Sequence, residues 1–320
     1  MVLVVAALFV AAPALAGNGG FAPVEPRSPN AVGIEDTYWV ILGFTGFIFV
    51  LVEGTLIYFV IKYRRRGRPV EDEGPQVRGH NRLEFAWTVA PVLILAVIGS
   101  FVFYKLPGID DPPSASAAGE PLEIRVEGRQ FYWNFRYPNG VIAVDRLRVP
   151  VDRVVLLEVT APTHDVIHSW WVPALGGKFD AIPGKVNETW FQVDQPGLYR
   201  GQCAELCGVQ HAAMLNSVEV LPQAEFARWF AEQTREQANP RGETALGRAT
   251  YQGVCAKCHG FRREGLIGPP LTEAAVSNSE AIASLLRDGR GAMPAVGKGW
   301  DERQVRAVIA YLQNGGASGS

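Results

Sequence analysis

Several potential metal ligands are crowded into residues 201–214, which read GQCAELCGVQHAAM. Two thiols, an imidazole and a thioether form a soft ligand set, which favours copper or zinc over magnesium or calcium. A blue-copper site needs a single Cys, so a second Cys four residues later indicates more than a mononuclear centre. A further imidazole is available upstream, in the stretch DVIHSWWVP. The candidate ligands are Cys203, Cys207, His211, Met214 and His168.

Three other interpretations of this cluster stay open. The spacing also fits one face of a helix, although Gly201 and Gly208 would break it and the flanking alternating runs favour a loop between strands. Alternatively, Cys203 and Cys207 form a disulfide in an oxidising compartment. In the third interpretation two Cys and two His hold a structural zinc, which leaves Met214 without a role.

A second chemical motif, CAKCH, occupies residues 255–259. C-x-x-C-H is the attachment signal for c-type haem, in which two thiols form thioether bonds and the adjacent imidazole reaches the iron. Cys255, Cys258 and His259 are therefore predicted to bind haem. Met293, in the stretch GAMP, is the expected second axial ligand, and His/Met ligation raises the haem potential, which suits electron transfer. A redox-active C-x-x-C pair is the alternative.

Composition argues against a disulfide scaffold and against nucleic-acid binding. The chain has 320 residues, enough for two or three domains, and 48% of them are hydrophobic, so any membrane part is a minority. The formal net charge of −2 gives no indication of a nucleic-acid partner. All four Cys, and both Met residues after Met1, lie at candidate ligand or attachment positions.

Two long apolar runs are predicted to anchor these motifs in a membrane. The first covers 37–61 and the second about 85–104, and each is long enough to span a bilayer. The basic stretch KYRRRGR at 62–68 predicts a cytoplasmic loop, which places both chain ends outside. Residues 37–105 are therefore predicted to form a transmembrane helical hairpin with a cytoplasmic basic loop. A helical hairpin in the core of a soluble protein is the alternative.

The amino-acid composition of the segments around this hairpin predicts what each segment is. Residues 1–16 form an apolar run ending in Ala-Leu-Ala, typical of a secretory signal peptide, with an additional membrane anchor as the alternative. Residues 17–36 are predicted to be an exposed arm, and 106–119 and 222–240 to be linkers. Short alternating runs within 120–221 predict a β-sandwich. Residues 241–315 carry the haem motif and an amphipathic helix at 301–313.

The pattern C-x-E-x-C-x-x-x-H-x-x-M, with DVIHSWWVP upstream, resembles subunit II of haem–copper cytochrome c oxidase. The resemblance covers residues 30–221 and implies a cupredoxin fold with a binuclear copper centre, CuA. The ligands that it implies are bridging Cys203 and Cys207, His168 with Met214 on one copper, and His211 with the backbone carbonyl of Glu205 on the other. The Glu205 carboxylate would bind a magnesium ion shared with subunit I. Asp165 would orient His168 through a hydrogen bond, or else form a turn.

Residues 241–315 resemble a small class I cytochrome c domain, in which the stretch IGPPL at 267–271 is similar to the loop that supports the haem-binding His. The whole chain thus resembles a multidomain membrane protein with a two-helix transmembrane hairpin, an all-β cupredoxin sandwich and an all-α cytochrome c domain. The implied role is the oxidase subunit through which electrons enter. Electrons from an external donor would pass through haem c and CuA to subunit I, where dioxygen is reduced to water with proton pumping.

The resemblance also implies partners and a location. The partners are oxidase subunits I and III, an external donor such as cytochrome c or a bc-type complex, and the bacterial inner membrane, with the redox domains on its periplasmic face. Glu84 lies three residues before Trp87, where the family has a Glu near the entrance of a proton channel in subunit I. A solvated acid at a helix start is the alternative for Glu84.

Three functional alternatives belong to other classes. The first is a subunit of a CuA-containing nitric oxide reductase, whose active site also lies elsewhere. The second is subunit II of a quinol oxidase, which lacks copper, and the intact ligand pattern argues against it. The third is a copper chaperone or carrier, against which the second redox motif and the two spans argue.

Phe131 marks one departure from the family pattern. It lies in RQFYWNF at 129–135, where the family usually has the Trp that accepts electrons from soluble cytochrome c. Residues 106–221 carry an excess of acidic side chains and 241–315 an excess of basic ones, so the two domains should attract each other. We therefore expect the tethered haem domain to dock over Phe131 and to supply the copper site internally.

Overall fold

The computed structural model describes residues 23–64, 67, 74, 76–113, 119–238 and 243–314. The predicted signal peptide at 1–16 and most of the predicted basic loop lie outside these residues. The chain divides into two compact units, one over Val32–Asp110 and the other comprising Met1–Ala31 with Asp111–Ser320.

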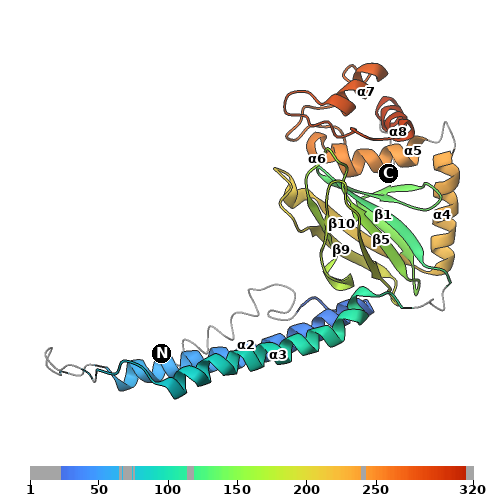
Figure 1. The fold of residues 1–320 in the computed structure, drawn as a ribbon. Coiled ribbons are helices and arrows are strands. Elements are labelled where there is room, and N and C mark those ends of the chain that lie inside the picture. The colour runs from blue at the N-terminus through green and yellow to red at the C-terminus, as the bar shows by residue number, and fades with distance from the viewer. Residues whose placement is uncertain are drawn as a thin grey trace. The chain divides into compact units, whose positions relative to one another are not determined.

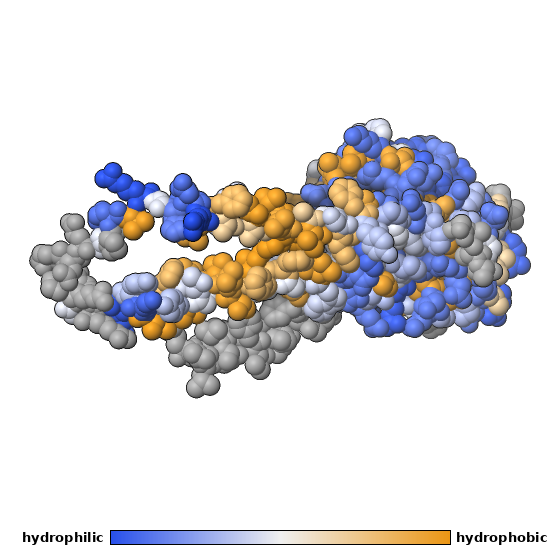
Figure 2. All heavy atoms as spheres, turned by 60° about the horizontal axis from the view of Figure 1, so that its bottom comes forward, coloured by the Kyte–Doolittle hydropathy of each residue, from blue (hydrophilic) through white to orange (hydrophobic). Residues whose placement is uncertain are grey.

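The first unit consists of the two apolar helices that the sequence predicts, α2 (Pro29–Lys62) and α3 (Asn81–Asp110) (Figure 1). At 1.5 Å per residue both exceed the roughly 30 Å hydrocarbon thickness of a bilayer. Their apolar side chains point outward, and Figure 2 shows these side chains gathered along the helices. By length and composition both helices can cross a membrane.

The predicted boundaries around the hairpin need correction. Helix α2 begins at Pro29, inside the predicted arm at 17–36, and α3 continues to Asp110, inside the predicted linker at 106–119. Asn30 in the first turn is buried, because its Nδ2 donates to the Trp190 carbonyl at 2.7 Å. Its Oδ1 accepts from the hydroxyl of Ser28 and the N–H of Ala31. The bond from Asn30 to Trp190 holds the end of the arm on the sandwich.

The predicted β-sandwich is confirmed and consists of two five-stranded sheets. The first sheet has the order β3 (Ile142–Val144), β2 (Tyr132–Arg136), β1 (Leu122–Arg129), β5 (Val155–Thr160) and β8 (Asn187–Phe191). The second has the order β4 (Arg146–Pro150), β10 (Leu215–Leu221), β9 (Gly197–Cys203), β6 (His168–Trp171) and β7 (Phe179–Ala181). Alternating side chains of the strands meet in one core, as two stacked sheets require.

Residues 222–240, predicted as a linker, contain helix α4 (Gln223–Ala238) lying along the sandwich (Figure 1). Phe226 is buried in the sandwich core, and Trp229 and Phe230 pack on the ring of Tyr137. Near the end of the helix, Gln237 exchanges two hydrogen bonds with the backbone of Ile142. The apolar face at i, i+3 and i+4 therefore attaches this segment to the sandwich.

The C-terminal domain is helical, as predicted. Its elements are α5 (Glu243–Thr250), a π-helical turn η3 (Tyr251–Cys255), α6 (Ala256–His259), α7 (Ser279–Asp288) and α8 (Glu302–Gln313). Helix α8 matches the predicted amphipathic helix and is capped by Asp301, whose Oδ1 accepts from Gln304 N at 2.8 Å. Helices α5 and α8 approach closely at Gly247, where a Cβ atom would lie 2.1 Å from the Ala307 carbonyl oxygen.

Candidate functional site

The sulfur atoms of the 201–214 segment converge at one end of the sandwich. Cys203 ends strand β9, the segment then forms a loop with a short turn η2 (His211–Ala213), and Met214 precedes β10. The loop interpretation is thus confirmed over the helical one. The Sγ atom of Cys207 lies 4.0 Å from Sγ of Cys203 and 3.8 Å from Sδ of Met214. It lies 3.7 Å from Nδ1 of His211.

His168, at the start of β6, completes this cluster from the neighbouring strand. Ligand atoms of His168, Cys203 and Cys207 lie within 4.8 Å of one another, and all three residues are buried. The ring is oriented by Asp165, whose Oδ1 lies 3.1 Å from Nε2. The other nitrogen, Nδ1, is buried without a hydrogen-bond partner. An orphaned buried imidazole nitrogen beside two thiols fits a metal ligand, because a metal would satisfy it.

The electrostatics of the two thiols also fit a metal centre. Burial opposes ionisation of Cys203, but the adjacent His168 imidazole and the backbone outweigh it and lower the pKa of Cys203. Burial, together with the neighbouring Cys203 thiolate, raises the pKa of Cys207 to about 12. A cation between the two sulfurs would relieve the second ionisation. The thiols are free, and their separation is about twice the 2.05 Å of a disulfide bond.

Glu205 and Asp165 take different positions around this centre. The Glu205 carbonyl accepts from Sγ of Cys203 at 3.3 Å, whereas its carboxylate is exposed. Burial disfavours the Asp165 carboxylate, but bonds from His168 and from the N–H groups of Val166 and Gln130 outweigh it and hold the pKa of Asp165 below its usual value. Of the two expectations for Asp165, the orienting contact to His168 is therefore present.

The CAKCH motif forms the end of the π-helical turn and helix α6. Nδ1 of His259 lies 2.7 Å from the carbonyl oxygen of Pro269, in the IGPPL stretch. This contact leaves Nε2 as the nitrogen that can reach an iron. Gly268 is required beside it, because a Cβ atom there would lie 2.8 Å from Cε1 of the His259 ring. The donor set and its orientation fit a c-type haem.

Met293 lies in a loop between α7 and α8 and packs, partly buried, against the apolar cluster that contains Cys255. Backbone bonds between Met293 and Arg290 in both directions close a tight turn. Gly289 permits this turn with φ +69, and a Cβ atom there would lie 2.6 Å from the Met293 carbonyl oxygen.

The haem motif contacts the sandwich directly. Lys257, between the two Cys, donates to the Phe131 carbonyl and to Oδ2 of Asp145, each at 2.7 Å. Gln210 of the metal-binding loop donates to Sγ of Cys258 at 3.0 Å. Burial raises the pKa of Asp145, although Lys257 acts in the opposite direction. The two candidate sites are therefore connected by single side chains.

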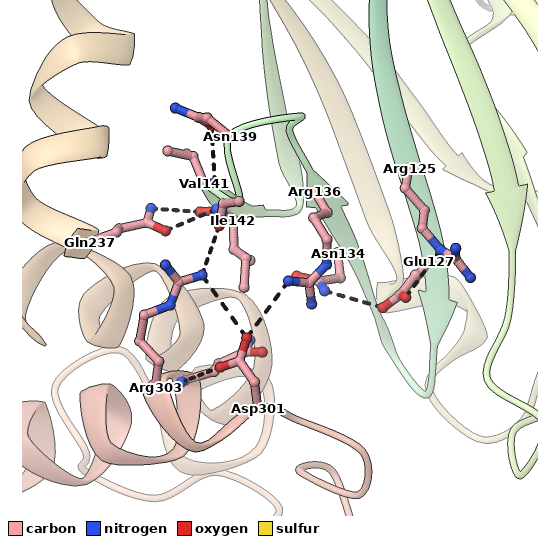
Figure 3. A network of polar contacts seen from close by, with 12 residues as sticks. Arg125, Glu127, Asn134, Arg136, Asn139, Val141, Ile142, Gln237, Asp301 and Arg303 are labelled. Atoms are coloured by element: carbon pink, nitrogen blue, oxygen red, sulfur yellow. Dashed lines mark hydrogen bonds and ion pairs between the residues drawn. The ribbon is translucent and has the colours of Figure 1, made fainter.

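Polar contacts continue at the rim of this interface (Figure 3). The Asp301 carboxylate lies 3.7 Å from Nη1 of Arg136 and 4.0 Å from Nη2 of Arg303. Arg303 also donates to the Gly140 carbonyl at 2.7 Å. The centre of the interface is tightly packed, because a Cβ atom on Gly253 would lie 2.3 Å from Cγ1 of Val144.

Sequence reasoning missed Asp145, Gln210 and Tyr132 as interface residues. Their partners are distant in sequence, and none of the three occupies a ligand position of a motif. The one available signal for Asp145 was its place after the short run VIAV, where a turn is expected.

Glu84 lies in the first turn of α3, and its Oε1 accepts from the N–H of His80 at 3.0 Å. His80 in turn accepts from Leu83 N through Nδ1. This reciprocal arrangement resembles a capping box and accounts for an acid at this helix start.

Three family descriptions match separate parts of the chain. Residues 21–104 match "Cytochrome C oxidase subunit II, transmembrane domain" and 141–221 match "Cytochrome C oxidase subunit II, periplasmic domain". Residues 242–312 match "Cytochrome C oxidase, cbb3-type, subunit III".

Similar proteins carry the same description. "Cytochrome c oxidase subunit 2" of Alkalihalophilus pseudofirmus is 33% identical over 323 residues, which cover 93% of this chain and 92% of that protein. The protein of this name from Cereibacter sphaeroides is 31% identical and covers 68% of this chain and 81% of its own length. Among solved structures, the periplasmic domain of cytochrome oxidase subunit II from Bradyrhizobium japonicum is 36% identical. The match covers 36% of this chain and 94% of that one, with a TM-score of 0.34.

Proposed function

Because the chain belongs to the cytochrome c oxidase subunit II family, we propose that it is the subunit through which electrons enter a haem–copper oxidase. The observation that carries this proposal is the contact of Gln210, in the loop that bears a soft metal-ligand cluster, with Cys258 of the c-type haem motif. A chain with two such sites in contact is suited to transfer electrons from an external donor to subunit I.

Six residues would hold a binuclear copper centre: Cys203, Cys207, His168, Met214, His211 and, through its carbonyl, Glu205. When bound, this centre takes up and releases single electrons. The chain's own contribution is to keep the ligands close together and oriented before the metal binds, and the contact between Asp165 and His168 is one example. The exposed Glu205 carboxylate would face subunit I and share a magnesium ion with it.

Cys255 and Cys258 would attach haem c covalently, and His259 and Met293 would bind its iron. Such a haem also exchanges single electrons, and His/Met ligation raises its potential. The Pro269 carbonyl fixes the tautomer and the orientation of the His259 ring.

The haem domain would supply the copper site within the same chain, docked over Phe131. The contacts of Lys257 with the Phe131 carbonyl and of Gln210 with Cys258 support this arrangement. Burial of Tyr132 and Val144 in the apolar cluster of the haem domain supports it as well. External donors such as cytochrome c or a bc-type complex would then meet the haem domain rather than the sandwich.

The two apolar helices would cross the bacterial inner membrane and contact subunit I and subunit III, with both redox sites on the periplasmic face. Glu84, at the cytoplasmic start of α3, would lie at the entrance of a proton channel in subunit I. Dioxygen reduction and proton pumping would take place in that partner.

The test is to purify the intact complex and measure copper, covalent haem and oxygen uptake. We expect two coppers and one acid-stable haem on this chain, and cyanide-sensitive oxygen uptake with reduced cytochrome c as donor. Fewer than two coppers on this chain, no haem that stays on it after acid acetone extraction, or nitric oxide reduction without oxygen uptake would contradict the proposal.

A further inference from the structure

The β1–β2 turn at 129–132 contacts ligand-bearing segments of both redox sites. Towards the copper ligands, the backbone N–H of Gln130 donates to Oδ2 of Asp165 at 3.2 Å, and its side chain donates to the Cys207 carbonyl at 2.7 Å. Towards the haem motif, the Phe131 carbonyl accepts from Lys257. One short turn thus supports both sets of ligands.

The same turn holds the loop that carries Met293. Nη1 of Arg129 donates to the Lys298 carbonyl at 2.9 Å. The hydroxyl of Tyr132 donates to the Val296 carbonyl at 3.3 Å and accepts from Nε1 of Trp300 at 2.5 Å. Between Met293 and Trp300 the other described backbone bonds are short-range, apart from Gly297 N to the Leu286 carbonyl. The sandwich therefore makes three hydrogen bonds to this loop.

Tyr132 is well suited to this role. Its side chain is fully buried, and its ring packs edge-to-face on Trp300 with centroids 6.3 Å apart. Burial raises the pKa of Tyr132, so the hydroxyl stays protonated and can donate. The Tyr132 hydroxyl both donates one hydrogen bond and accepts another. Removing its oxygen would therefore leave Nε1 of Trp300 and the Val296 carbonyl without this hydrogen-bond partner.

We propose that Tyr132 is a positioning residue for the axial ligand of the haem. Its hydroxyl fixes the loop at 296–300, so the strength of Met293 as a haem ligand depends on a residue of the copper-binding domain. This inference rests on the proposed function, because it needs a haem held by Met293. It adds to the proposed function that the sandwich affects how strongly Met293 binds the haem, besides receiving electrons from the haem.

The test compares Tyr132→Phe with Tyr137→Phe in the intact complex. Tyr137 is a matched control, because it is also buried and its hydroxyl also makes two hydrogen bonds, with the backbone of Arg148 inside the sandwich. Imidazole displaces a weakly held methionine from oxidised haem, which is followed by loss of the methionine–iron charge-transfer band. We expect Tyr132→Phe to bind imidazole at least about tenfold more tightly than the wild type, because two buried hydrogen bonds are lost. Tyr137→Phe should match the wild type.

A second variant, Trp300→Phe, removes the donor to Tyr132 together with part of the buried ring, and should shift imidazole affinity in the same direction. Covalent haem content and the copper spectrum, measured on each variant, show that the domains have formed. Equal imidazole affinities of the wild type, Tyr132→Phe and Tyr137→Phe would overturn the positioning role and leave the proposed function intact. A wild-type complex with covalent haem but no methionine–iron band would overturn the positioning role and the Met293 assignment together. Absence of covalent haem would overturn the proposed function itself.

Discussion

Nζ of Lys257, inside the C-x-x-C-H motif, lies 2.7 Å from Oδ2 of Asp145 in the turn between β3 and β4. The side chains of Lys257 and Asp145 are only 17% and 21% exposed. The other Asp145 oxygen accepts from Trp133 N, and the ring of Trp133 lies edge-on to the ring of His168, with centroids 6.2 Å apart. A short series of contacts therefore leads from the C-x-x-C-H motif to His168, a proposed copper ligand.

Replacing Lys257 by Met should destabilise the contact between the haem domain and the sandwich. The substitution leaves the Asp145 carboxylate buried without its cation, and breaking such a pair costs about 3 kcal/mol. We expect haem-to-copper electron transfer to slow by at least about tenfold, because the docked arrangement is less populated. Flash photoreduction of the haem, with absorbance of the copper centre as readout, measures this rate.

The matched control is Lys178→Met, since Lys178 forms an ion pair with Asp180 at the surface. An exposed pair contributes at most about 1 kcal/mol, so this variant should transfer electrons normally. Equal rates in Lys257→Met and Lys178→Met would show that the interfacial pair has no part in docking.

Asp165→Asn should weaken copper binding without removing a ligand. Loss of a partner that orients a metal-binding His typically costs 10–100-fold in metal affinity. We expect a loss of about tenfold or more in copper affinity, measured by competition with a chelator. Asp180→Asn, on the neighbouring strand β7, is the control, and a similar loss in both variants would contradict the role of Asp165.

Cys207→Ser should separate the two redox sites. Sγ of Cys207 lies near three candidate ligands, so its loss should abolish the mixed-valence copper spectrum. The haem band should be unchanged, because Cys207 makes no contact with the haem motif in the described structure. Absorption and electron paramagnetic resonance spectra of the variant test both statements, and a mixed-valence spectrum that persists would exclude Cys207 as a bridging ligand.

Glu84→Gln tests the proposed proton entrance. Gln can accept the His80 N–H bond as Glu84 does, so the helix start should be preserved while the charge is lost. We expect oxygen-uptake turnover to fall several-fold while haem-to-copper transfer stays normal. Unchanged turnover would leave helix capping as the role of Glu84.

The parts that the sequence predicts are those set by local pattern. Alternation in runs such as LEIRVEG predicts strand β1, and the sulfur spacing predicts a ligand cluster that the structure brings together. Apolar spacing at Phe226, Trp229 and Phe230 indicates a helix face, yet the ring of Tyr137 that covers this face cannot be read from the sequence.

The features that the sequence could not predict depend on contacts between residues far apart in the chain. Lys257 and Asp145 are 112 residues apart, and Gln210 and Cys258 are 48 apart, so nothing local marks either contact. The start of α2 depends on Asn30 meeting the Trp190 carbonyl, 160 residues away. Composition cannot show this contact, so it predicts an arm over 29–36 where the helix already begins.

Truncation after Ala238 tests the internal electron route. This end point keeps helix α4, because Phe226 belongs to the sandwich core and Gln237 is bonded to Ile142. The truncated chain lacks the haem domain and has Phe131 at the position where the sequence resemblance implies a Trp that receives electrons. We therefore expect soluble cytochrome c to reduce its copper centre at least tenfold more slowly than it reduces the copper centre of the intact chain. Stopped-flow reduction at fixed ionic strength compares the two, because charge attraction is screened by salt.

Phe131→Trp in the truncated chain is the complementary variant. If the missing Trp limits electron transfer from soluble donors, this substitution should restore part of the lost rate. In the intact chain it should have little effect, because the haem domain already covers this turn through the contact of Lys257 with the residue 131 carbonyl. A truncated chain that accepts electrons as fast as the intact one would make the haem domain an accessory and the internal route wrong.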